Sequence, residues 1–100
     1  MSDDACLWRL PDGQVVAAGH EAIFGRAAGA TVHLSDGRVA TVHAELSARE
    51  GGWTLIERGG RLFVQGRASA RVAVRPGVSI ELAPGVAVEA LHVPWPALSV

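Results

Sequence analysis

Residues 24–46 read FGRAAGATVHLSDGRVATVHAEL, and this stretch decides the fold. A Gly25-Arg26 pair follows a short apolar segment, a glycine turn leads into a second one, and an Asp36-Gly37 turn leads into a third. Short apolar segments separated by such turn residues are typical of β-strands. We therefore expect two loops to leave the same end of a small sheet, one carrying Arg26 and the other residues 40–43.

The same rhythm extends in both directions from this stretch. Turn residues recur about every eight to twelve residues, as in all-β sandwiches and barrels. Valine, which favours strands, is among the commonest apolar residues. We predict an all-β fold, a two-sheet antiparallel β-sandwich of about ten to eleven short strands with no helix of note. The expected strands span residues 5–10, 14–18, 21–24, 31–34, 40–50, 53–57, 62–64, 71–74, 78–82 and 86–93.

Residues 40–50 are ambiguous between a helix and a strand. Ala, Glu, Leu and Arg favour a helix there. However, Val42, Ala44 and Leu46 alternate with polar residues, and a period of two is typical of a strand. A Gly51-Gly52 pair then fits a hairpin turn. We choose the strand.

The chain of 100 residues is long enough for one domain with a single core. We expect residues 1–93 to form it. Residues 94–100 begin Pro94-Trp95-Pro96, which cannot continue a sheet, so we interpret them as an exit segment or the start of a linker. The chain would then be the regulatory domain of a larger protein.

Composition excludes several classes of protein. No apolar run approaches the roughly 20 residues of a membrane helix, and the acidic start differs from a secretion signal. A net charge of −1 argues against a nucleic-acid surface. We expect a cytoplasmic protein with no nucleic-acid or membrane partner. Because every basic side chain except histidine is arginine, we also expect a bacterial source.

No pattern of catalytic or metal-binding residues is present. The lone Cys6 excludes an internal disulfide and a cysteine-based zinc site. The four histidines are scattered singly, and no serine has the context of a nucleophile elbow. The Gly25-Arg26 segment has neither the glycine spacing nor the lysine of a nucleotide-binding loop. We predict no enzymatic activity, no metal and no cofactor.

Arginines are concentrated in the second half of the chain. Five of the nine arginines fall in one short stretch within residues 51–100 whose only acidic residue is Glu57. Solvated strand edges are one interpretation, since charge runs usually face solvent and discourage edge pairing. An anion-attracting rim is the other. The residues are Arg58, Arg61, Arg67, Arg71 and Arg75.

A β-sandwich that presents an arginine and a hydroxyl from neighbouring loops can hold a phosphate group. The guanidinium offers two parallel charged hydrogen bonds, and hydroxyls and loop amides can occupy the remaining oxygens. Loop arginines recognise phosphopeptides in several kinds of binding module. Arg26 and Thr41 are the first candidates for such a site.

A series of short motifs along the chain resembles the forkhead-associated (FHA) family of phosphothreonine-peptide binding modules. The resemblance covers roughly residues 6–92 and implies a β-sandwich that binds a protein or a phosphothreonine peptide. It lies in Gly25-Arg26 after Ile23-Phe24, Asp36 with Val39, His43-Ala44, Trp53-Thr54-Leu55-Ile56-Glu57, Phe63-Val64-Gln65-Gly66 and the stretch from Val74 to Leu82.

The resemblance also assigns roles to residues. It implies that Gly25 and His43 brace the loops. The family's phosphate-contacting serine is Ala40 here, and its peptide-holding asparagine falls near Gly59 and Gly60. Thr41 and an arginine could replace these groups, although on a strand the side chain at 41 would point away from the face of position 40. The implied phosphopeptide-binding residues are Arg26, Thr41, Arg58, Arg61 and Gln65.

We therefore expect an FHA-type interaction and signalling module, in a signalling, transcription-control or secretion protein, with phosphothreonine binding weakened or lost. Losing a hydrogen bond to a charged group costs roughly 1.5–3 kcal/mol. The alternative is a phosphate-independent structural or oligomerisation domain, for which a homodimer is one form of assembly.

Overall fold

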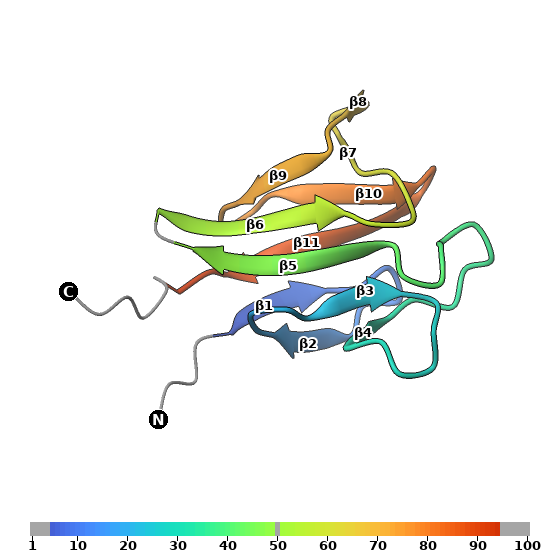
Figure 1. Cartoon of the computed structure of the whole chain (residues 1–100), viewed down its shortest axis with the longest axis horizontal. Helices are drawn as coiled ribbons and strands as arrows, with labels where there is room; N and C mark the ends of the chain where they lie inside the picture. Colours follow the sequence, from blue (N-terminus) through green and yellow to red (C-terminus); the bar gives the residue numbers. More distant parts are fainter. Residues whose placement is uncertain (1–4, 50, 95–100) are drawn as a thin grey trace.

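The computed structural model describes residues 5–49 and 51–94, and within these ranges every regular element is a β-strand (Figure 1). Strands form here because short runs of alternating buried and exposed residues are separated by turn residues. The strands are β1 (Cys6–Arg9), β2 (Val15–Ala18), β3 (Ile23–Gly25), β4 (Val32–His33), β5 (Ala44–Arg49), β6 (Gly52–Glu57), β7 (Phe63–Val64), β8 (Arg67–Ala68), β9 (Arg71–Val74), β10 (Ser79–Ala83) and β11 (Val86–His92).

The strands make two sheets, which confirms the predicted β-sandwich. One sheet has the order β2-β1-β11-β10-β7-β8 and the other β4-β3-β5-β6-β9. Every paired neighbour is antiparallel except β3 and β4, which run parallel. The expectation of purely antiparallel sheets is wrong for this pair, because residues 26–31 return the chain to the start of β3 instead of folding it into a hairpin.

The core lies between the sheets and is centred on two aromatic rings. Trp8 of β1 and Phe24 of β3 belong to different sheets, and both are fully buried. Their ring centroids lie 5.0 Å apart at an interplanar angle of 81°, an edge-to-face contact. This contact joins the two layers directly behind the loop that follows β3. It therefore fixes where that loop leaves the sandwich.

The strand expected over residues 40–50 begins only at Ala44. Residues 41 and 42 form a turn, so the alternation argument is wrong there: Val42 is 41% exposed and His43 is buried. The reason is that the His43 ring is drawn inward by two hydrogen bonds, described below. This difference matters for Thr41, because the opposite-face argument applies only to a strand.

The turn at residues 65–66 and the contact between Trp53 and Pro94 also differ in how far the sequence predicts them. Gln65 and Gly66 form the turn between β7 and β8, and both have positive φ (51° and 80°), as in a two-residue hairpin turn. The strand β8 that follows this turn was not predicted. At the other end, the Trp53 indole Nε1 donates a hydrogen bond to the Pro94 carbonyl (2.6 Å), whereas Trp95 and Pro96 lie outside the described residues.

The buried thiol of Cys6 provides a test of this packing. Burial raises its pKa from 9.0 to about 12. Because the thiolate is the reactive form, we expect native Cys6 to resist an aromatic disulfide reagent near pH 9, and to react at once in denaturant. The raised pKa also means that its contribution to stability is complete below pH 9 and is lost as the pH rises toward 12. Rapid native modification would contradict the packing.

Candidate functional site

Three loops meet at one end of the sandwich, on the right in Figure 1. They follow β3, precede β5 and follow β6. We call residues 26–27, 38–43 and 58–61 the rim. The Arg26 and Ala27 amides donate to the carbonyls of Ala40 (3.0 Å) and Thr41 (3.1 Å). The Gly59 amide donates to the Val42 carbonyl (2.8 Å), so all three loops form one hydrogen-bonded structure.

His43 fixes the middle loop of the rim from inside. Its side chain is 2% exposed. The Ala40 amide can only donate, so Nδ1 accepts at 3.0 Å. The Arg61 carbonyl can only accept, so Nε2 carries the proton and donates at 2.7 Å. The ring is thus neutral and spans the second and third loops. A bracing role for His43, as the resemblance implies, would act through these two hydrogen bonds.

Glycines allow the loops to approach this closely. A Cβ at Gly25 would overlap the Thr41 carbonyl, and a Cβ at Gly60 would overlap the His43 ring. A Cβ at Gly59 would lie 2.6 Å from the Val42 carbonyl oxygen. The role of Gly25 was predicted, but that of Gly60 was missed. Its only sequence signal is the Gly59-Gly60 pair, which reads equally well as an ordinary loop.

Arg26 is held at the base of its guanidinium and is open at the tip. Its Nε donates to the Val39 carbonyl (2.9 Å), which lays the side chain along the middle loop. Within the described residues its two terminal nitrogens have neither a hydrogen-bond partner nor an ion pair. A guanidinium with a fixed Nε and two unused terminal nitrogens is suited to a multiply bonded anion.

Backbone donors also remain at the rim. The Thr41, Val42 and Arg61 amides donate to no other described residue. Thr41 is exposed and lies in the turn next to the loop of Arg26. Successive amides in a turn form a concave site for anions. The rim therefore combines a partly tethered arginine, an exposed hydroxyl and loop amides.

The other predicted site residues are placed differently. The Arg58 side chain is paired with Glu45: the Glu45 Oε1 lies 2.9 Å from Arg58 Nε and 2.6 Å from Arg58 Nη2. Arg58 Nη1 also donates to the Glu57 carbonyl (3.2 Å). Arg61 is exposed and has no ion-pair partner among the described residues. Gln65 lies in the β7–β8 turn, at the edge of the other sheet, so the structure does not bring it to the rim.

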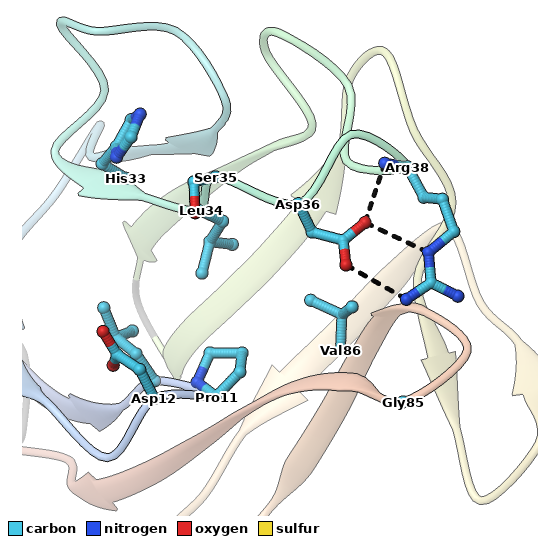
Figure 2. A pocket seen from close by; sticks show the side chains of 10 residues that line it. Pro11, Asp12, His33, Leu34, Ser35, Asp36, Arg38, Gly85 and Val86 are labelled. Atoms are coloured by element: carbon cyan, nitrogen blue, oxygen red, sulfur yellow. Dashed lines mark hydrogen bonds and ion pairs between the residues drawn. The ribbon is translucent and has the colours of Figure 1, made fainter.

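A cleft of about 380 Å³ lies beside residues 34–38 (Figure 2). Asp36 and Arg38 form a two-pronged ion pair at its wall, with two contacts of 3.1 Å. The hydrogen bonds from the Arg38 side chain and amide lower the pKa of the Asp36 carboxyl to about 2. The sequence did not predict this cleft, which is lined by Leu10, Pro11, Asp12, His33, Leu34, Ser35, Asp36, Arg38, Gly85 and Val86.

Neither a metal site nor a membrane span is found in the described part of the chain. Over residues 5–49 and 51–94, no three His, Cys, Asp or Glu residues are grouped so as to hold a metal ion. The same residues include no helix that could cross a bilayer.

Comparison with known proteins bears directly on this rim. A family model for the FHA domain matches residues 22–83, which include all three rim loops. The chain belongs to the FHA family. FHA domains are protein-interaction modules. A comparison with curated protein sequences found no significant match.

Solved structures show the same fold at low sequence identity. An FHA domain studied for phosphothreonine-dependent interactions is 20% identical, with a TM-score of 0.77 over 90% of this chain and 98% of that one. The first FHA domain of Rv1747 from Mycobacterium tuberculosis is 21% identical, with a TM-score of 0.77 over 91% of this chain and all of that one. EmbR from the same organism, solved with a low-affinity phosphopeptide, is 14% identical, with a TM-score of 0.75 over 96% of this chain and 26% of that one.

The contact between Gly60 and His43 can be tested by a pair of glycine substitutions. In Gly60→Ala the new methyl group must displace the His43 ring, so we expect a loss of about 1–3 kcal/mol in the free energy of unfolding. Gly29→Ala is the matched control, because a Cβ there meets open space and the residue lacks a positive φ. Chemical denaturation measures both, and equal stabilities would contradict the close approach.

Proposed function

We propose that this FHA domain binds phosphothreonine peptides through Arg26, assisted by Thr41, Arg61 and the amides of the middle loop. We further propose that it binds them more weakly than an FHA domain with a hydroxyl at position 40. The observation that carries the proposal is the geometry of Arg26, whose guanidinium is tethered through Nε and keeps both terminal nitrogens without partners among the described residues.

The proposed weakness follows from two positions. Ala40 has no hydroxyl to donate where the family has its serine. Gly59 and Gly60 have no side chain with which to hold the peptide backbone, and the close approach of Val42 and His43 opposes adding one. The missing hydroxyl removes a hydrogen bond to the charged phosphate, which costs roughly 1.5–3 kcal/mol, or about one to two decades of affinity. The missing side chain at positions 59 and 60 removes a bond to a neutral peptide group, which costs roughly 0.5–1.5 kcal/mol.

Other rim residues can replace part of the missing hydrogen bonding. Because residues 41 and 42 form a turn and not a strand, the Thr41 hydroxyl is not restricted to the face opposite position 40. Arg61 is exposed, has no ion pair among the described residues, and follows directly after the glycine pair. Arg58 is bound by Glu45, so we assign it to holding the third loop in place. Gln65 contributes to the sheet edge and not to this site.

We place this module within a larger bacterial regulatory protein in the cytoplasm. The EmbR chain, of which this chain covers 26%, shows that the fold occurs within longer proteins. The arginine-only basic composition fits a GC-rich bacterial genome.

Peptide titration tests the phosphate site by both loss and gain of affinity. We expect a phosphothreonine peptide library, read by fluorescence anisotropy, to give weak binding that disappears in the unphosphorylated library. Arg26→Ala should abolish the signal. Ala40→Ser restores a donor at the edge of the site, so it should tighten binding about ten- to a hundredfold.

Arg71→Ala is the matched control, because Arg71 is an exposed arginine on β9, outside the rim. It should leave the affinity unchanged. A complete lack of phosphate-dependent binding in both the unmodified chain and Ala40→Ser would overturn the proposal. It would then favour the phosphate-independent interaction domain.

A further inference from the structure

The outer strands of the two sheets differ in how they are protected. These strands are β2, β8, β4 and β9. β8 and β4 are only two residues long. β9 begins with Arg71 and is followed by Arg75 and Pro76. Short length, charge and proline are the usual means by which a sheet edge avoids pairing with another molecule. Each of these three edges uses at least one of them.

β2 uses none of these devices. Its four residues, Val15–Ala18, are all apolar, and the flanking residues Gln14 and Gly19 carry no charge either. β1 is the only described strand that pairs with it. Among the described strands, β2 is thus the one uncharged edge strand of more than two residues.

Backbone groups of β2 are directed out of the sheet. The Leu10 amide donates to the Gln14 carbonyl (2.8 Å), and the pairs Trp8–Val16 and Cys6–Ala18 follow in register. Hydrogen-bonded and non-hydrogen-bonded pairs alternate in an antiparallel ladder. The N–H and C=O groups of Val15 and Ala17 therefore point to the open edge, where no described residue pairs with them.

The outer face beside this edge is apolar. Val15 is 52% exposed and Leu7 is 38% exposed, which makes them two of the three exposed large hydrophobic residues in the described chain. Leu7 is the cross-strand partner of the exposed Ala17. Val15 lies opposite Arg9, which is paired with Glu89 (3.2 Å). The open edge is therefore flanked by an apolar strip of Leu7, Val15 and Ala17. The charge of the neighbouring Arg9 is offset by Glu89.

From this edge we propose that β2 pairs with β2 of a second copy of the chain, joining the two six-stranded sheets across a two-fold axis. In the antiparallel register centred on Val16, Val15 of one copy faces Ala17 of the other, and the reverse. Both pairs exchange N–H···O=C bonds, so every outward group of the two residues is used. No like charges face each other, because β2 has none.

A second copy fits this edge because the sequence of β2 is complementary to itself in that register. The outer face would then align Arg9, Val15, the partner copy's Ala17 and its Leu7 in one row, so exposed apolar side chains cover one another. The contact is small, and small interfaces are weak. We therefore expect association at high concentration or where a larger protein brings two copies together.

Two alanines provide matched variants for the test. Ala17 and Ala73 are both exposed residues on outer strands, β2 and β9. We expect sedimentation equilibrium to show a concentration-dependent dimer for the unmodified chain and for Ala73→Arg. Ala17→Arg would place two cations across the two-fold interface and should remain monomeric. Thermal unfolding at low concentration checks that both variants are folded.

Amide hydrogen exchange identifies the surface independently. The Val15 and Ala17 amides should exchange rapidly in the monomer and become protected as the concentration rises, whereas the Val16 and Ala18 amides stay protected throughout. A chain that stays monomeric at millimolar concentration would overturn the proposal, as would a dimer that persists in Ala17→Arg. The proposal does not depend on the phosphate site, because β2 lies outside the rim. Titrating the same samples with phosphopeptide tests the phosphate site separately.

Discussion

The neutral imidazole of His43 is the constraint on which the rim depends. One nitrogen accepts from the Ala40 amide and the other donates to the Arg61 carbonyl, so a single buried ring holds two loops at fixed separation. The first loop joins them through the hydrogen bonds of Arg26 and Ala27 to the middle loop. The loops that carry the candidate binding groups are thus tied to the sandwich, and little ordering remains for a ligand to bring about.

The same closeness limits what the rim can offer a peptide. Gly25, Gly59 and Gly60 allow backbone and ring to approach within contact distance, but they contribute no side-chain donors. In the proposed mode of binding, the peptide is held by Arg26, loop amides and the exposed residues Thr41 and Arg61. A module with such a reduced site would bind more tightly when presented in pairs, and the proposed pairing of the uncharged edge strand β2 would provide this outside the rim.

Much of the fold could be predicted from local patterns, because alternation and turn residues act over a few positions. β9 has the expected bounds, and Val32 and Leu34 are buried while His33 is exposed, as their alternation predicts. The turn at residues 41–42 could not be predicted in this way. It depends on the buried His43 ring, which contacts a carbonyl distant in the sequence.

Side-chain pairing was also beyond the sequence. Nothing local indicates that Arg58 would be engaged by Glu45 of a neighbouring strand while Arg26 would keep its terminal nitrogens without described partners. The cleft beside Asp36 likewise needs three segments brought together by the fold, from the β1–β2 turn, the segment before β5 and the β10–β11 turn. The local sequence identifies candidate binding residues, and the tertiary contacts decide which of them remain available to a ligand.

The protonation state of His43 tests the central claim most directly. Nitrogen-15 NMR of the imidazole distinguishes the two neutral tautomers from the cation. The structure requires the neutral form with hydrogen on Nε2 and an accepting Nδ1 at neutral pH. Observation of that tautomer, with a slowly exchanging Nε2 proton, would support a rim braced from within. A doubly protonated ring, or hydrogen on Nδ1, would contradict it.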